Sequence, residues 1–372
     1  MRGIYIHIPF CLRKCPYCDF YSVTLDRSLS EQYIDALIRN FRADKYRGLC
    51  ADTVYIGGGT PSALPAELIS KLMEGVYKNF SIAENAEITI EANPCTVSDD
   101  KLAAYRASGI NRISFGVQSA DDRELKALGR LHDFDTAERA IEGAQRAGFD
   151  NISADMMIGL SGQSERDVLN SAERLTALPI RHISAYMLKI EPNTAFDNDK
   201  LKASLPGDDK VSDMYLSLCK FLEGKGFYQY EISNFAQTGF ESRHNIKYWR
   251  LEEYIGFGPA AHSLFDKRRL RVPRDLRGYI SAPLQTELPE EEPFDERVEY
   301  IMLSLRLREG LDMQRLSALV GSSSAQKLKE RAAAFEKHGL CRLSDGRVSL
   351  TPEGFLVSNS VILEFLCAVG LA

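Results

Sequence analysis

Short apolar runs alternate with amphipathic segments over the first 235 residues of the chain. The apolar runs lie at 3–8, 53–56, 87–91, 112–118, 151–157, 182–188 and 228–232. The amphipathic segments lie at 30–46, 65–80, 98–108, 121–128, 135–147, 164–177 and 208–225. Runs rich in Val, Ile and aromatic residues predict strands, and amphipathic segments of this length predict helices. Such alternation indicates parallel strands joined by right-handed crossovers.

About seven strands are too few to close an eight-stranded barrel. We therefore expect an α/β fold, with a partial (β/α)6 TIM-like barrel over residues 1–235. Ligands of such barrels bind at the carboxyl ends of the strands, on the loops that lead to the helices. Glu91 and Gln118 close two of the predicted strands, and Asp155 lies within a third. An isolated Glu is usually solvated, but residues of this kind on several strand ends predict one shared site.

A glycine run, Gly57-Gly58-Gly59-Thr60-Pro61, follows the strand at 53–56. It can be a tight turn, or a place where the backbone comes close to a ligand. Three successive residues without a Cβ favour the second interpretation.

The segment 236–288 breaks the alternation and contains His244, Tyr248 and the single tryptophan, Trp249. A lone histidine is more often a hydrogen-bonded structural residue than a ligand. The acidic, proline-containing stretch at 288–293 predicts a linker, after which residues 289–372 change pattern.

Helices are predicted there at 296–307, 314–320 and 325–338, followed by a hairpin at 341–351 with an Asp345-Gly346 turn. Helices followed by such a hairpin predict a small winged-helix-like C-terminal domain. Winged helices often bind DNA, but the third helix mixes positive and negative residues without a basic face. We therefore expect a role in packing or partner docking.

Cys11, Cys15 and Cys18 follow the first predicted strand with the spacing C-x3-C-x2-C. Three thiolates on one loop can hold an iron–sulfur cluster and leave one iron without a protein ligand, whereas structural zinc takes four ligands. The alternatives are zinc with His7 or Asp19 as fourth ligand, or three unrelated thiols. His7 belongs to the strand and Asp19 adjoins Cys18, so we favour the cluster. The other cysteines lack ligand spacing and are interpreted as incidental thiols: Cys50, Cys95, Cys219, Cys341 and Cys367.

The composition is ordinary for a globular protein, with 44% hydrophobic and 26% charged residues among 372. A formal net charge of −6 argues against nucleic-acid binding driven by bulk charge. Eight cysteines in a chain this long do not indicate a disulfide framework. No signal peptide and no bilayer-spanning apolar run is recognisable, so we expect a cytoplasmic protein, with peripheral membrane association left open.

The motifs resemble, in their order, the radical S-adenosylmethionine (SAM) family, in particular its oxygen-independent coproporphyrinogen III oxidase branch and the haem chaperones within that branch. They are YIHIPFC, CPYCDF, GGGTPS, IEANP, FGVQS, LGRLHD and HNIKYW. The resemblance implies a 4Fe-4S cluster on Cys11, Cys15 and Cys18, with SAM on the open iron. It implies SAM contacts by Tyr5, Tyr17, Gly58, Gly59, Thr60, Glu91, Gln118, Arg130 and Asp155. Carboxylates can accept hydrogen bonds from an amino group or a ribose, and Arg130 can meet a carboxylate.

The chain departs from the oxidases at several positions. Phe20 stands where they have a further cysteine, and the first strand begins without their N-terminal extension. Lys189 replaces a small residue, so no SAM contact is carried over there. These departures favour the haem chaperones, whose HNIKYW motif implies haem contacts by His244 and Tyr248, because histidine can be an axial ligand beside aromatic residues.

The resemblance thus implies a haem chaperone whose partners are a haem donor and client haemoproteins. It also implies a low-potential electron donor such as ferredoxin or flavodoxin if SAM is cleaved. From the net charge and the mixed charges of the third helix we expect no nucleic-acid partner. The alternative is a radical SAM enzyme that acts on a tetrapyrrole, although we do not expect coproporphyrinogen oxidase activity and assign no catalytic residue. A DNA-binding regulator is the third possibility. The expected domains are 1–235, 236–288 and 289–372.

Overall fold

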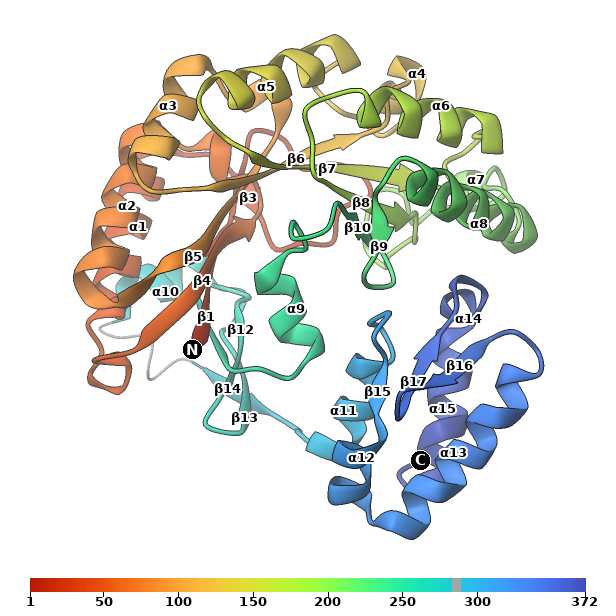
Figure 1. Cartoon of the computed structure of the whole chain (residues 1–372). Coiled ribbons are helices and arrows are strands. Elements are labelled where there is room, and N and C mark those ends of the chain that lie inside the picture. The colour runs from red at the N-terminus through yellow and green to blue at the C-terminus, as the bar shows by residue number, and fades with distance from the viewer. Residues whose placement is uncertain (283–288) are drawn as a thin grey trace. The chain divides into compact units, whose positions relative to one another are not determined.

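The computed structural model of the protein describes residues 1–282 and 289–372. The chain forms two compact units (Figure 1). The first unit comprises Met1–Met214 and Glu253–Glu292, and the second comprises Tyr215–Glu252 and Pro293–Ala372. The domain limits expected after residues 235 and 288 stay predictions.

A curved, largely parallel sheet is the centre of the first unit. Its described parallel βα strands are β1 (Arg2–Ile8), β4 (Cys50–Gly58), β5 (Ser81–Ala92), β6 (Arg112–Gln118), β7 (Asn151–Ile158) and β8 (His182–Met187). They lie side by side in chain order and pair in parallel throughout. The predicted partial (β/α)6 TIM-like barrel is confirmed. The strand expected at 228–232 is shorter than predicted: it covers only Tyr228–Gln229 (β9), which pairs with β10 (Asn234–Ala236) in a short antiparallel hairpin of the second unit.

The helices of the first unit lie along the outer side of this sheet (Figure 1). They are α1 (Arg27–Phe41), α2 (Ala66–Asn79), α3 (Asp99–Ala107), α4 (Asp122–Ala127), α5 (Phe134–Arg146), α6 (Glu165–Thr176), α7 (Asp199–Lys202) and α10 (Leu276–Ser281), with α8 (Asp208–Gly224) crossing the unit boundary. The first helix begins before residue 30 because the Asp26 carboxylate accepts a hydrogen bond from the Leu29 amide at 2.8 Å. It ends at Phe41, and Asp44–Tyr46 is a separate 3-10 turn.

The sheet continues on the other side of β1 with strands that the sequence pattern did not predict. β11 (Tyr254–Phe257) runs parallel to β1, and β12 (His262–Phe265), β13 (Arg268–Arg271) and β14 (Glu290–Glu292) follow in antiparallel order. The expected linker is therefore wrong at Glu290–Glu292, because these glutamates pair with the arginines of β13 across the strands. Leu288 lies outside the described residues.

Successive side chains of the parallel strands point to opposite faces. One set is aliphatic or aromatic and fully buried, as at Ile6, Val54, Ile90 and Phe115. The other set is polar and lines the inner side of the barrel. The site described below is built from this second set.

The second unit contains α9 (Arg243–Trp249) and the C-terminal domain. That domain consists of α11 (Glu296–Ser304), β15 (Leu311–Asp312), α12 (Met313–Val320), α13 (Ser322–Glu336), β16 (Cys341–Ser344), β17 (Arg347–Leu350), α14 (Pro352–Leu356) and α15 (Ser358–Val369). Its small sheet has the order β15-β17-β16, and α13 packs on α15 through Phe335 and Phe365. The predicted winged-helix-like arrangement is confirmed.

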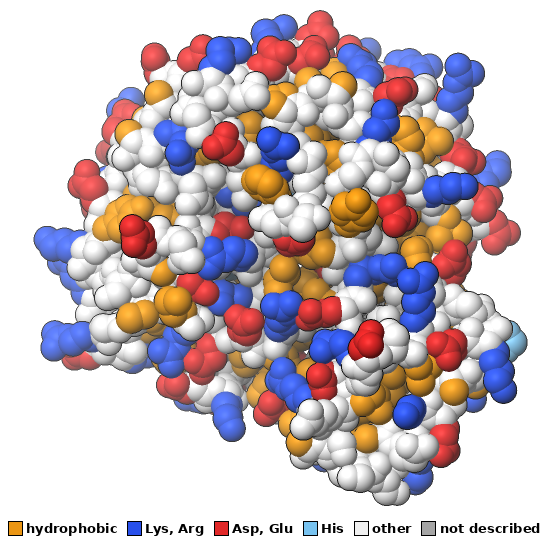
Figure 2. All heavy atoms as spheres, in the orientation of Figure 1, with side chains coloured by type: hydrophobic (Ala, Val, Ile, Leu, Met, Phe, Trp, Pro, Cys, Tyr) orange, Lys and Arg blue, Asp and Glu red, His pale blue; other side chains and the backbone are white. Residues whose placement is uncertain are grey.

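Charged side chains of both signs are interspersed over the face drawn in Figure 2. Within the described ranges, no helix is both long and apolar enough to cross a membrane.

Candidate functional site

The loop that carries the three cysteines is closed at its base by backbone hydrogen bonds. β2 (Phe10–Cys11) pairs with β3 (Val23–Thr24), the Val23 amide donates to the Pro9 carbonyl at 2.7 Å, and the Leu25 amide donates to the Cys11 carbonyl at 2.9 Å. Within the loop, the Cys18 amide donates to the Cys15 carbonyl at 3.1 Å. All three thiols are half-buried. We call residues 11–20 the cysteine loop.

His7 anchors this loop and is not available as its fourth ligand. Its Nε2 lies 2.9 Å from the Tyr21 carbonyl, and its Nδ1 lies 2.9 Å from the Tyr5 hydroxyl. A neutral ring with the proton on Nε2 satisfies both contacts. Burial lowers the pKa of His7 to about 4, which keeps the ring neutral. Both ring nitrogens are thus engaged with the protein.

Asp19, the other candidate for a zinc ligand, is half-exposed and faces Arg274 at 3.9 Å. No three His, Cys, Asp or Glu side chains of the described residues converge closely enough to hold one metal ion. A tetrahedral zinc with Zn–S bonds of about 2.3 Å would draw its sulfur ligands to within about 4 Å of one another. A 4Fe-4S cluster instead takes each thiolate on a different iron. The choice of a cluster over zinc stays a prediction.

The cysteine sulfurs have polar neighbours that suit such a cluster. Thr60 Oγ1 donates to Cys11 Sγ at 3.4 Å, and Arg130 Nη1 donates to Cys15 Sγ at 3.5 Å. Burial raises the pKa of Cys18, and the nearby sulfurs of Cys15 and Cys11 raise it further. Donors and a positive charge beside sulfur stabilise thiolate and tune a cluster. The three cysteines thus fit a cluster with one open iron.

Glu91, near the carboxyl end of β5, is held at both oxygens. Tyr55 donates its hydroxyl to Oε1 at 2.8 Å, and the Gly58 amide donates to Oε2 at 3.0 Å. Burial raises the pKa of Glu91 to about 7 against these two hydrogen bonds, and the charge of Asp155 adds to the rise. Each oxygen retains a second lone pair with which a ligand's amino group could bond.

The glycines after β4 are explained by the protein's own packing. A Cβ on Gly58, whose φ is +112°, would lie 2.6 Å from the His7 ring. A Cβ on Gly59 would lie 2.9 Å from the carbonyl oxygens of Ile8 and Phe10. The amides of Gly59 and Thr60 donate to these same carbonyls at 2.8 Å. Close approach by a ligand was expected to explain the glycines, and the structure gives a different reason, while ligand contact at Gly58, Gly59 and Thr60 stays a prediction.

Gln118 and Arg130 meet over Gly116 at the end of β6. Gln118 has φ +75°, unusual for a residue other than glycine, at a register shift against β7. A Cβ on Gly116 would lie 2.9 Å from the Gln118 side-chain nitrogen. Arg130 Nη2 donates to the Gly116 carbonyl at 2.5 Å. Backbone strain of this kind clusters at functional sites.

Arg130 also offers an unused donor. Its Nε is buried without a hydrogen-bond partner among the described residues. Although burial opposes it, the nearby Tyr17 and Cys15 raise the pKa of Arg130, so it stays charged. A ligand carboxylate would satisfy this nitrogen, and the residues here thus fit SAM.

Asp155 and Tyr17 complete the set. Asp155 on β7 accepts a hydrogen bond from Ser114 at 3.2 Å, and burial raises its pKa. Tyr17 packs on a cluster of Leu128, Met157 and Leu160, with the Phe196 ring 6.0 Å away. The structure therefore brings every predicted cluster and SAM residue into the first unit.

The two predicted haem residues lie in the second unit, on α9. His244 is fully buried, and its Nε2 lies 2.8 Å from the Tyr248 hydroxyl. The helix is fixed near its C-terminal end because Lys247 pairs with Glu252 at 2.8 Å and Arg250 forms a two-pronged pair with Glu309 at 2.9 Å. Coordination of haem iron by Nε2 would require the bond to Tyr248 to break.

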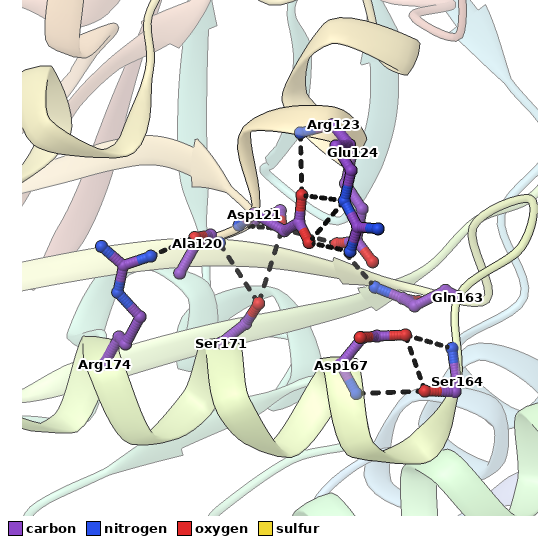
Figure 3. Close-up of polar contacts among 10 residues, drawn as sticks. Ala120, Asp121, Arg123, Glu124, Gln163, Ser164, Asp167, Ser171 and Arg174 are labelled. Atoms are coloured by element: carbon purple, nitrogen blue, oxygen red, sulfur yellow. Dashed lines mark hydrogen bonds and ion pairs between the residues drawn. The ribbon is translucent and has the colours of Figure 1, made fainter.

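A separate polar cluster lies at the starts of α4 and α6 (Figure 3). Asp121 accepts from the Arg123 amide and guanidinium, and Ser164 and Asp167 cap α6 reciprocally. Gln163 donates to Glu124 at 3.0 Å, and Ser171 accepts from the Ala120 amide at 3.2 Å. These acidic groups serve helix capping and are satisfied within the cluster.

Tyr55, Arg112 and Ser114 belong to the site but were not singled out from the sequence. A signal was present, since each stands two residues from another polar residue on the same face of its strand. Interpreting each strand only as an apolar run concealed it.

Comparison with known proteins gives the family. Residues 5–175 match the radical SAM superfamily, and residues 293–357 match the HemN C-terminal domain. The chain is 35% identical to the heme chaperone HemW of Bacillus subtilis, covering 98% of this chain and 99% of that protein. It is 36% identical to the heme chaperone HemW of Escherichia coli, covering 98% of both. The chain belongs to the HemW family of radical SAM proteins.

HemW relatives are thus matched along almost the whole chain. The solved structure of coproporphyrinogen III oxidase (HemN) from Escherichia coli, described as a radical SAM enzyme, superimposes with a TM-score of 0.83. It covers 98% of this chain and 89% of that one at 24% identity. This likeness shows the shared fold. The family resemblance inferred from the motifs is confirmed.

Proposed function

We propose that the protein is a haem chaperone, which binds haem and transfers it to client haemoproteins while a 4Fe-4S cluster and SAM occupy its barrel. The observation that carries the proposal is identity of 35% and 36%, over nearly the full length, to proteins named heme chaperone HemW. The partners would be a haem donor and client haemoproteins, with no nucleic acid. The proposed location is the cytoplasm, with peripheral membrane association as a further possibility.

Within the barrel, Cys11, Cys15 and Cys18 would hold the cluster. The chemistry that the bound cluster and SAM would supply is reductive cleavage of SAM. The partner that provides the electron would be a low-potential donor such as ferredoxin or flavodoxin. The chain's own residues would bind and orient the SAM. Glu91 would accept from the amino group, Arg130 would hold the carboxylate through its unpartnered Nε, and Asp155 would accept from the ribose. The other predicted SAM contacts, at Tyr5, Tyr17, Gly58, Gly59, Thr60 and Gln118, belong to the same proposal.

Haem would bind in the second unit at α9, with His244 as an axial ligand and Tyr248 beside the macrocycle. Because His244 is enclosed and bonded to Tyr248, binding would be coupled to local opening of α9. Haem uptake should then be slower than diffusion of haem to an exposed histidine.

The test is haem binding and transfer by anaerobically reconstituted protein. Haem is titrated into the wild type, and the loaded protein is mixed with an apo-haemoprotein whose spectrum reports uptake. We expect saturable binding and transfer that depends on contact with the acceptor. Transfer at the rate of haem dissociation into buffer, measured with an excess of a haem scavenger, would contradict the chaperone function.

A second candidate function is an enzyme acting on a tetrapyrrole, which the fold likeness to HemN favours. Against it, Phe20 stands where the oxidases have a further cysteine. The Phe20 side chain is 68% exposed. An anaerobic assay with coproporphyrinogen, SAM and a reductant distinguishes the two. Formation of protoporphyrinogen would overturn the preference for a chaperone.

A further inference from the structure

Arg112 on β6 is a buried charge of the first unit to which the site described above assigns no role. It is only 2% exposed and is among the largest fully buried side chains. Its Nε has no hydrogen-bond partner, and within the described ranges its guanidinium forms neither a hydrogen bond nor an ion pair. Thr89 lies directly opposite on β5, fully buried, and its hydroxyl is also without a partner. An arginine with a purely structural role would bond to neighbouring carbonyls or carboxylates.

The charged and titratable groups around Arg112 come from every neighbouring strand of the barrel. Tyr5, Tyr55, Glu91, Asp155 and His182 reach this interior from β1, β4, β5, β7 and β8, and Arg130 acts on Asp155 from beyond β6. His182 bonds to Ser153 at 2.7 Å, and burial keeps its pKa well below 6.5, so it stays neutral. Arg112 is therefore a buried positive charge that acts on both carboxylates.

Burial of the two carboxylates favours their protonated forms, and Arg112 works against it. Burial is the largest influence on both Glu91 and Asp155 and raises their pKa values, whereas the charge of Arg112 lowers both. Ordered water between Arg112 and Thr89 would satisfy their unpartnered atoms, because such water needs two to four polar partners.

We propose that Arg112 is a positioning residue, whose charge favours the ionised forms of Glu91 and Asp155, the forms that accept hydrogen bonds from SAM. This inference rests on the proposed binding of SAM in the barrel. Arg112 touches neither ligand nor cluster in this account. Its effect is on the charge of the two carboxylates that do the binding.

The test measures SAM affinity against pH on cluster-loaded protein, by calorimetry or equilibrium dialysis between pH 6 and 9. Arg112→Met and Arg112→Gln remove the charge, and Arg112→Lys retains it. The matched control is Arg106→Met, an arginine of α3 that bonds to the Ile110 carbonyl at 2.7 Å outside the barrel interior. A shift of one unit in the pKa of a carboxylate changes its ratio of ionised to protonated form tenfold. We expect the neutral variants to bind SAM about fivefold to tenfold more weakly at pH 7, with affinity recovering toward pH 9.

Arg112→Lys should keep most of the wild-type profile, and Arg106→Met should keep all of it. Iron content and thermal unfolding establish that each variant is intact, and either neutral variant suffices if the other does not fold. A neutral variant whose pH profile superimposes on the wild type overturns the inference alone. So does Arg112→Lys binding as weakly as the neutral variants, since charge would then be irrelevant. Wild-type protein that binds no SAM at any pH overturns the proposed SAM site and this inference with it.

Discussion

Each of the two compact units contains a buried histidine and a glutamate that share two properties. His7 and His244 are 4% and 0% exposed, and each bonds to a tyrosine hydroxyl. Glu91 and Glu231 each have a pKa raised by burial to about 7. Burial and perturbed titration therefore do not distinguish the two units.

The difference lies in what surrounds these residues. The first unit also contains three half-buried thiols and the Nε of Arg130, which has no hydrogen-bond partner among the described residues. In the second unit His244 is fully buried and forms a hydrogen bond with Tyr248. Glu231 accepts a hydrogen bond from the Ser233 amide at 3.1 Å within the hairpin of β9 and β10. A candidate site is thus recognised by ligand atoms that the fold leaves accessible, rather than by burial alone.

The largest expected effect is the loss of the cluster site of the first unit. Cys15→Ala should abolish cluster assembly, because the two remaining thiolates cannot hold a cluster that needs three cysteine ligands. Iron and sulfide content after anaerobic reconstitution measures this. Cys50→Ala removes an exposed thiol and should assemble normally. Full cluster content in the Cys15 variant would remove the cysteine loop from the proposal.

Glu91→Gln should weaken SAM binding by roughly tenfold to a hundredfold, since a hydrogen bond to a charged group contributes about 1.5–3 kcal/mol. Direct titration with SAM measures it. Glu231→Gln is the matched control and should bind SAM as the wild type does. Equal weakening in both variants would contradict a specific role for Glu91.

The same pair of variants tests stability against pH. Because the folded-state pKa of each glutamate is raised from 4.5 to about 7, its stabilising contribution is complete below about pH 4.5 and is lost as pH rises through 7. Each Gln variant should therefore lose less stability than the wild type between pH 5 and 8. Thermal unfolding at the two pH values checks this, and parallel curves for variant and wild type would show that the glutamate does not titrate there.

His244→Ala should destabilise the second unit by about 2–4 kcal/mol, because it leaves a cavity and removes the hydrogen bond between His244 Nε2 and the Tyr248 hydroxyl. If His244 is also the axial ligand, the variant should lose the haem-bound spectrum of the wild type at temperatures where it remains folded. Wild-type haem affinity and spectrum in a folded variant would make His244 structural only.

Tyr248→Phe is expected to have the smallest effect, about 1 kcal/mol, because it removes the hydrogen bond to His244 and keeps the ring. It also removes the group that competes with iron for His244 Nε2. Haem affinity should therefore stay equal or increase, as measured by titration. Clearly weaker binding would contradict the competition between Tyr248 and haem.

The sequence by itself determined the features that depend on local periodicity and covalent spacing. The strand at Arg112–Gln118 has the limits that the apolar run predicts, and the spacing of Cys11, Cys15 and Cys18 places three ligands on one loop. These features are local because side-chain alternation and loop length are set within a few residues.

Only the tertiary structure decided which distant residues meet. β11 pairs with β1 although about 250 residues separate them in the chain, and β14 forms where a linker was expected. Both ring nitrogens of His7 form hydrogen bonds, one with Tyr5 and one with Tyr21. The glycines at the end of β4 are required by contacts with His7 and with carbonyls of β1 and β2. The Nε of Arg112 has no hydrogen-bond partner among the described residues. Such pairings depend on how strands register and which side chains exclude water, and no local pattern in the chain encodes them.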